Sequence, residues 1–331
     1  MEKRCQREEY VVSIDLEKGR VRFCFIVGLL FFLQSCNRAE DRQNQILEDG
    51  ITQIDLAAGE DVAELDVSTI YGNGMKLVAL KADGGFVIGD IDKVVLYDDR
   101  IYVLDKSIAE TLFIYDSDGN PLERITIGKG GDELTSIGDF CVDDGVLFVL
   151  DERSNRVGRY DLDGATRLGS TVSLPNNISN IAAIGGHLLC YRALVDNFDG
   201  GMASSTLFLL DQEGNVKKHW LPVSESNFYL TQYIGDKSVM RKLNNRVYIS
   251  RLMDDAFYMY SAESGQLSQR FKVDFGEKGI PDNLKTGHTD LEFVDNLHKG
   301  AYHYSLSGYV ETNKFVCFNI SRGRAVNSVL M

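Results

Sequence analysis

A repeated unit is the feature that most constrains how this chain of 331 residues can fold. Residues 92–128 align with residues 138–174, and Asp105 matches Asp151 at a spacing of 46. Glycines that close successive units stand at positions 119, 164, 214 and 265, which gives separations of 45, 50 and 51 residues. A fixed period of this length is typical of repeat architectures, in which each unit is one supersecondary element.

Each unit consists of short apolar runs separated by turns. In the first unit the runs cover residues 94–96, 101–104, 112–115 and 123–127, with turn residues at 98–99 and 116–119. Turns of this kind between β-branched and aromatic runs predict hairpins. No unit shows the 3.6-residue period of a helix, which excludes repeats built of helix pairs. Four strands per unit predict an all-β fold, a β-propeller of four-stranded blades.

The later units drift from the first two. A third covers residues 185–214, a fourth residues 244–265, and a fifth about residues 291–318. We assign residues 51–331 to one propeller domain and expect six blades. Propellers remove their sheet edges by lending an N-terminal strand to the last blade, and residues 51–56 or 77–80 could supply it. The alternative is that the last blade is incomplete.

Corresponding positions of the units should share a structural role. Tyr102, Phe148, Leu188 and Val247 take equivalent places in the second strand of each unit by this alignment. We expect all four side chains to be buried between neighbouring sheets.

The N-terminal segment is typical of export. An uncharged run at residues 23–33 follows Lys18, Arg20 and Arg22, and Ser35 stands just before Cys36. A basic region, a short apolar region and a small residue before a cleavage site describe a secretory signal. The run is too short to span a bilayer, which takes roughly 20 residues. Residues 1–35 are therefore predicted to be a signal peptide, and residues 36–50 a polar tether.

Residues 33–36, Leu-Gln-Ser-Cys, resemble a bacterial lipobox. That resemblance implies that Cys36 carries acyl chains such as palmitate, and stable anchoring needs more than one chain. Glu40 and Asp41 resemble the acidic tag of Bacteroidetes lipoproteins that reach the cell surface. The resemblance implies a lipid-anchored protein of the outer membrane, at the cell surface or, alternatively, on the periplasmic face.

The repeat itself resembles a known family. The chain is similar to the six-bladed β-propeller lipoproteins of Bacteroidetes-type bacteria, relatives of NHL-repeat propellers, over about residues 50–320. The residues that carry the resemblance are 91–96, 98–105 and 113–119. Most members of that family have no assigned activity, so the resemblance implies an architecture and no chemistry.

Three predicted loops are longer than a turn requires, and they fall on one predicted rim. They cover residues 192–205, 225–237 and 276–289. Loops of this kind are often functional. The candidate ligand-binding side chains there are Arg192, Asn197, Phe198, Tyr229, Tyr233 and His288.

Composition narrows the function. A net charge of −14 argues against nucleic-acid binding. Cys141, Cys190 and Cys317 each lie in an apolar run, which favours small buried side chains over disulfides or metal ligands. The sequence has no CxxC, HExxH or phosphate-binding glycine motif, so we expect no metal and no cofactor.

Two classes of function remain. The first is a binding or scaffold module for a glycan, a peptide or an envelope protein, present as a monomer and held to the membrane only by its lipid. The second is a propeller hydrolase or lyase that acts on a carbohydrate or a lactone. An enzyme of that kind needs convergent carboxylates on the channel-facing strands. The first strands at residues 94–96 and 140–142 are apolar, which favours the binding module.

Overall fold

The computed structural model describes the propeller region and not the N-terminal segment. The described residues are 50–59, 76–128, 133–164, 166–192, 201–223, 239–251, 254–281, 297, 299, 302–312, 315–322 and 325–331. They belong to the second of two compact units, Asp41–Met331. The predicted signal peptide, Cys36 and nearly all of the tether lie outside them.

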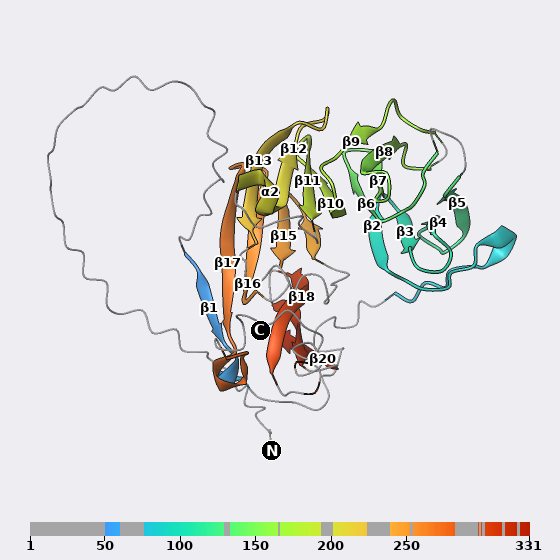
Figure 1. Ribbon diagram of the computed structural model, residues 1–331. Helices are drawn as coiled ribbons and strands as arrows, with labels where there is room; N and C mark the ends of the chain where they lie inside the picture. The colour runs from blue at the N-terminus through green and yellow to red at the C-terminus, as the bar shows by residue number, and fades with distance from the viewer. Residues whose placement is uncertain are drawn as a thin grey trace, which may run out of the picture. The chain divides into compact units, whose positions relative to one another are not determined.

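Strands dominate the described part of the chain, and they form five sheets (Figure 1). The first sheet contains β2 (Lys93–Tyr97), β3 (Arg100–Asp105), β4 (Thr111–Asp116) and β5 (Pro121–Thr126). The second contains β6 (Asp139–Asp143), β7 (Val146–Asp151), β8 (Arg156–Tyr160) and β9 (Val172–Ser173). The third contains β10 (Ile178–Ile184), β11 (His187–Arg192), β12 (Ser205–Leu210) and β13 (Val216–Pro222).

The fourth and fifth sheets depart from this plan at their edges. The fourth contains β14 (Met240–Leu243), β15 (Arg246–Ser250), β16 (Ala256–Ser261) and β17 (Gln266–Asp274), with β1 (Thr52–Asp55) added beside β17. The fifth contains β18 (His303–Glu311), β19 (Val316–Arg322) and β20 (Ala325–Leu330). The all-β propeller with four-stranded blades is confirmed. The expectation of six blades is wrong for the described residues, which form five.

The N-terminal strand does not complete the last blade. β1 runs parallel to β17, with Thr52 opposite Phe271 and Asp55 opposite Asp274. Residues 77–80 form no strand, although Lys81 donates its backbone N–H to the Gly119 carbonyl at 2.9 Å. Of the two alternatives drawn from the sequence, closure of the fifth sheet by either segment is therefore wrong. The edge that β1 covers is the outer edge of the fourth sheet.

The short elements are few among the described residues. They include the 3-10 turns η1 (Leu56–Ala58), η2 (Asp83–Gly85) and η4 (Gly276–Lys278) and the α-helical turn α2 (Gly201–Ser204). Within this part of the chain, no helix has the length and apolar character needed to cross a membrane.

The turns explain why the repeat keeps its glycines. Asp98 and Asp99 have φ values of 48° and 56° and join β2 to β3 in the two-residue turn that the sequence predicts. A Cβ on Gly119 would lie 2.2 Å from the Ala79 carbonyl oxygen, and one on Gly214 would lie 2.6 Å from that of Ser173. The closing glycine thus lets the last turn of one unit pack against the chain that precedes it.

The core lies between successive sheets, and it reveals a register error in the sequence alignment. Tyr102 packs against the second sheet and Phe148 against the third. Leu188 and Val247, however, pack against the preceding sheet, whereas Leu189 and Tyr248 pack against the following one. A slip of one residue moves a side chain to the opposite face of a strand. The structural equivalents of Tyr102 are therefore Phe148, Leu189 and Tyr248.

Candidate functional site

The corrected register places four charged residues at one position, at the end of the second strand or directly after it, in the first four sheets. Each stands three residues after the side chain that packs against the next sheet. The four are Asp105, Asp151, Arg192 and Arg251. The first two sheets therefore carry a carboxylate there, and the third and fourth a guanidinium.

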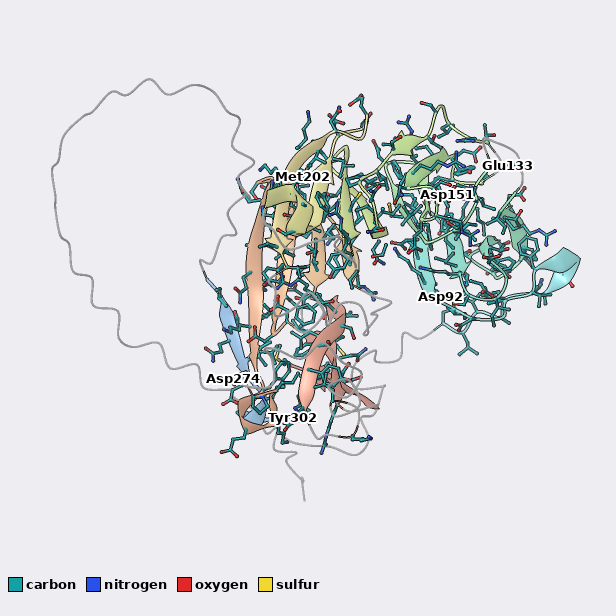
Figure 2. The ribbon with its side chains drawn as sticks, viewed as in Figure 1. Asp92, Glu133, Asp151, Met202, Asp274 and Tyr302 are labelled. Carbon is teal, nitrogen blue, oxygen red and sulfur yellow. The ribbon has the colours of Figure 1, made fainter. Side chains whose placement is uncertain are left out.

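The carboxylates hold backbone segments together. Asp105 accepts hydrogen bonds from the backbone N–H groups of Gly89, Asp90, Ile108 and Ala109, at 2.7–2.9 Å. Asp151 is fully buried in the second sheet (Figure 2) and accepts from Thr135, Ser136, Ser154 and Arg156. Both residues thus tie the connection that enters a sheet to the turn after its second strand, and their role is structural.

We expect this arrangement to make stability depend on pH in the acid range. Burial alone would raise the pKa of Asp151, but the hydrogen bonds from Thr135, Arg156 and Ser136 outweigh it and lower the pKa from 3.8 to about 2. A carboxyl whose pKa is lower in the folded state stabilises the fold above the unfolded pKa, and this stabilisation is lost as the pH falls through the folded pKa. About 2 kcal/mol should disappear between about pH 5 and pH 2. Urea unfolding across this range would measure the loss in the free energy of unfolding. The loss should be smaller in Asp151→Asn. An equal dependence of stability on pH in the two proteins would contradict the assignment.

The guanidiniums occupy the same position near the predicted rim. The Arg192 Cζ atom lies 4.6 Å from the Phe208 ring centre, and its Nη1 donates to the Ala203 carbonyl at 3.1 Å. Arg251 pairs with Asp254 at 3.3 Å and donates to the Pro222 carbonyl at 3.0 Å. Both side chains hold the ends of strands that flank the long loops.

Of the six predicted ligand-binding residues, Arg192 lies in the described part of the chain. It is 7% exposed at the end of β11. The other five, Asn197, Phe198, Tyr229, Tyr233 and His288, lie outside the described residues. The strand ends that flank two of the three loops do lie together, since Val223 donates its backbone N–H to the Ser204 carbonyl at 2.9 Å.

A buried Ser–His pair lies near the same strand ends. The Ser205 Oγ and His219 Nδ1 atoms are 2.9 Å apart, and both residues are buried. Ser205 Oγ also lies 3.2 Å from the Gly201 carbonyl oxygen. A nucleophile must reach its substrate, and a fully buried hydroxyl does not. We therefore interpret the pair as part of the packing of the third sheet.

The first strands carry ion pairs at their ends. Lys93 on β2 pairs with Asp139 on β6 at 2.7 Å, and the second carboxylate oxygen of Asp139 accepts the backbone N–H of Ile181 at 2.8 Å. Lys242 on β14 pairs with Asp143. The sequence predicts the apolar middle residues of the first strands. The charged residues at the ends of these strands link the first four sheets. Each of the two carboxylates named here is neutralised by a lysine, so these contacts join the blades.

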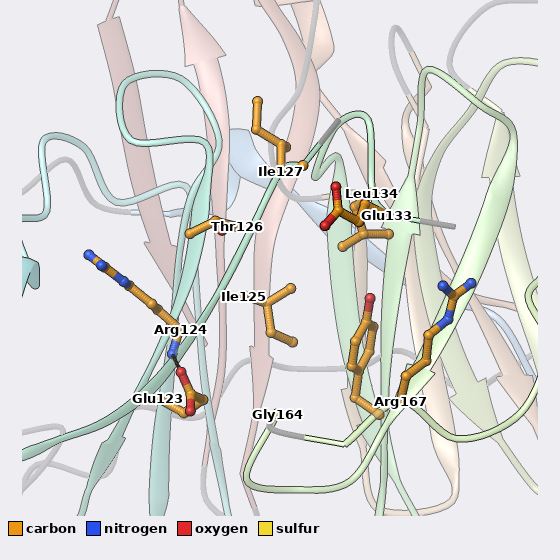
Figure 3. A pocket seen from close by; sticks show the side chains of 11 residues that line it. Glu123, Arg124, Ile125, Thr126, Ile127, Glu133, Leu134, Gly164 and Arg167 are labelled. Carbon is orange, nitrogen blue, oxygen red and sulfur yellow. Dashed lines mark hydrogen bonds between the residues drawn. The ribbon is translucent and has the colours of Figure 1, made fainter. Parts of the chain in front are cut away.

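A cleft of about 450 Å³ lies between the first and second sheets. β5 forms one wall. The other lining residues outside this strand include Gly128, Glu133, Leu134, Tyr160, Gly164 and Arg167. Figure 3 shows Ile125 pointing from β5 toward the side of Glu133 and Arg167, while Arg124 points the opposite way. Ile125 and Leu134 are buried, so the floor of the cleft is apolar.

Polar groups surround this floor. Glu123, Glu133, Tyr160 and Arg167 all line the cleft. Burial raises the pKa of Tyr160, and the nearby Arg167 opposes that shift, so the phenol stays a neutral hydrogen-bonding group. The cleft therefore offers carboxylate acceptors, a guanidinium and a hydroxyl around apolar side chains.

Two glycines shape the cleft. A Cβ on Gly158 would lie 2.9 Å from the Tyr160 ring, so the ring folds over this bare position of β8. Gly164 has a φ of +73°, and a Cβ there would lie 2.6 Å from Ile114 of the first sheet. The closing glycine of the second unit thus brings its turn against the first sheet and forms one end of the cleft.

Comparison with known proteins decides the family. Residues 51–330 match the family described as "Domain of unknown function (DUF4934)". The chain belongs to this family. No curated protein matches this chain.

Comparison of the DUF4934 domain with solved structures gives several matches. A "Putative exported protein" of Bacteroides fragilis is 13% identical with a TM-score of 0.64, over 85% of this chain and 77% of that one. A member of the DUF4221 family from Bacteroides vulgatus is 9% identical with a TM-score of 0.44, over 72% and 80%. Virginiamycin B lyase from Staphylococcus aureus is 13% identical with a TM-score of 0.38, over 71% and 68%. The first likeness supports the propeller fold, and none of them assigns chemistry.

The sequence patterns of the DUF4934 domain did not indicate the cleft. Long loops were the expected ligand site, whereas a strand, a short turn and a connection form the cleft. Gly158 beside Tyr160 on β8 was the available signal, because a glycine inside a strand marks a close approach of another group.

Proposed function

We propose that the DUF4934 domain is an exported binding module that holds a neutral oligosaccharide in the cleft between its first two sheets. The observation that carries this proposal is an open cleft of about 450 Å³ with an apolar floor and polar side chains around it. Sugars bind through apolar ring faces and through hydroxyls that both donate and accept hydrogen bonds. Glu123 and Glu133 would accept from such hydroxyls, and Arg167 and Tyr160 would donate to them.

Hydrolysis is the second candidate, because the cleft holds two carboxylates. Glycosidases use a pair of Asp or Glu side chains beside the scissile bond. A binding module leaves the oligosaccharide intact, whereas a hydrolase or a lyase releases shorter products. Chromatography of the ligand after prolonged incubation separates the two.

Replacing Arg167 with alanine should weaken oligosaccharide binding by about tenfold, or about 1.4 kcal/mol. The change removes a charged donor from the cleft wall. Isothermal titration with cellohexaose, xylohexaose, mannohexaose and chitohexaose would measure the affinity. Arg153→Ala is the matched control, because Arg153 also donates to a backbone carbonyl, that of Thr135 at 3.1 Å, but does not line the cleft. Equal affinities of the two variants would contradict the proposal.

The rim residues Arg192, Asn197, Phe198, Tyr229, Tyr233 and His288 remain the rival site. Deletion of residues 197–201 shortens one of the three long loops, and such a change costs little stability. Binding in the cleft predicts that this deletion leaves the affinity unchanged. Loss of binding in the deletion, with Arg167→Ala unaffected, would place the ligand at the rim.

We further propose that the domain is exported and anchored by lipid at Cys36, in the outer membrane. The support is the signal-like segment at residues 1–35, the lipobox-like residues 33–36 and the fold likeness to the Bacteroides fragilis protein. Cys36→Ala removes the thiol that would be acylated, so the protein should leave the membrane fraction and lose labelling by a palmitate analogue. Cys317→Ala, which changes a half-buried cysteine of β19, should leave both unchanged. Retention of label in Cys36→Ala would disprove the anchor.

A further inference from the structure

A second cavity, of about 160 Å³, lies between the second and third sheets. It is close to the turns at residues 144–145 and 185–186, at the opposite end of the strands from Asp151 and Arg192. Its apolar lining comes from both sheets: Phe148, Val157, Val172, Ala183 and Leu188. The polar residues that also line it are Asp143, Asp144, Arg159, His187, Asp211 and Gln212. The cavity explains why Phe148 is only partly buried, contrary to the expectation from the repeat.

The size of the cavity fits one ring. An apolar cavity of about 150 Å³ in another protein stays dry and binds benzene. The present cavity differs from that example because a cationic side chain also lines it.

Arg159 of β8 brings a buried donor to this cavity. Its Nη2 donates to the Ser170 carbonyl at 3.4 Å. Its Nε is buried and has no hydrogen-bond acceptor within the described residues. A buried donor left without an acceptor costs about 1–3 kcal/mol, so a molecule that brings an acceptor into the cavity would be stabilised there.

The carboxylates beside the cavity do not require a cationic ligand. Asp143 is paired with Lys242. Asp211 accepts hydrogen bonds from Asn215 and pairs with Lys217 at 3.0 Å. Together these two residues hold the pKa of the Asp211 carboxyl well below its usual range. Asp144 lies in the exposed turn between β6 and β7. Asp143 and Asp211 are already neutralised by lysines, which leaves Asp144 as a negative charge beside the cavity. A neutral acceptor therefore suits the cavity better than an anion would.

We propose that this cavity is a binding site for a small, mostly apolar molecule about one ring in size that carries one neutral hydrogen-bond acceptor. The apolar body lies among Phe148, Val157 and Leu188, and a carbonyl or hydroxyl oxygen accepts from Arg159 Nε. The site is separate from the cleft between the first and second sheets and does not depend on the function proposed for it.

Two molecules of the same shape test the role of the acceptor. Acetophenone carries a carbonyl oxygen where α-methylstyrene carries a CH₂ group. Ligand-detected NMR titration of the full chain should show that acetophenone binds at least tenfold more tightly. Arg159→Met removes Nε while keeping a side chain of similar length, so the preference for acetophenone should disappear. Arg167→Met, which changes the cleft, should keep the preference.

Three results would overturn the proposal. Equal binding of the two molecules would mean that the cavity is purely apolar, and absence of binding by both would mean that water satisfies Arg159. A preference that survives Arg159→Met would assign the acceptor contact elsewhere. Should Arg159→Met fail to fold, Ala183→Leu, which fills the cavity from the facing sheet, must abolish acetophenone binding or the proposal fails.

Discussion

Replacing Asp151 with alanine should lower the free energy of unfolding by about 3–5 kcal/mol, the range found when one partner of a buried ion pair is removed. Asp151 is fully buried, and its carboxylate accepts hydrogen bonds from Thr135, Ser136, Ser154 and Arg156. The substitution would leave the Arg156 Nε and several backbone N–H groups without their acceptor. Each such group costs about 1–3 kcal/mol when it stays buried.

Urea unfolding of purified protein would measure this change. Asp163→Ala is the matched control, because Asp163 also pairs with an arginine, Arg100 at 2.6 Å, but is 64% exposed. Exposed pairs contribute about 0–1 kcal/mol. A loss for Asp151→Ala as small as that of Asp163→Ala would show that the carboxylate does not hold the second sheet together.

The second large effect is expected at the contact between the fourth and fifth sheets. Phe257 of β16 is fully buried, and its ring centre lies 4.9 Å from that of Tyr309 and 5.4 Å from that of Phe318. Phe257→Ala would leave a cavity between the two sheets and should cost about 3–5 kcal/mol. Hydrogen exchange should show β18 and β19 losing protection before the second sheet does.

Phe148→Ala provides the comparison for this variant. Phe148 is only partly buried and already borders a cavity, so the truncation should cost clearly less than that of Phe257. A larger loss for Phe148→Ala than for Phe257→Ala would contradict the packing described above.

The strands and turns could be predicted because their signals are local. The turn at Asp98 and Asp99 and the closing glycines at 119 and 164 fix where each strand begins and ends, and the structure has them there. The match of Asp105 with Asp151 marked a shared structural role, and both are buried carboxylates that bind backbone N–H groups.

Features that depend on distant residues could not be read in the same way. Alignment by sequence slipped by one residue at Leu188 and Val247, because both faces of these strands are apolar and the pattern does not distinguish them. The pairing of β1 with β17 joins residues more than 200 positions apart, and no local motif indicates this pairing. The sequence did not indicate the cleft for the same reason, since Glu123 and Arg167 line it from two different repeat units.

Hydrogen exchange with a bound oligosaccharide tests the central claim most directly. The full chain would be saturated with the hexaose that binds most tightly in titration, and exchange would be compared with that of the free protein. Binding in the cleft predicts added protection at residues 123–128 and 158–167, with none at residues 201–210. Protection at residues 201–210 alone, or at no segment despite saturation, would contradict the account.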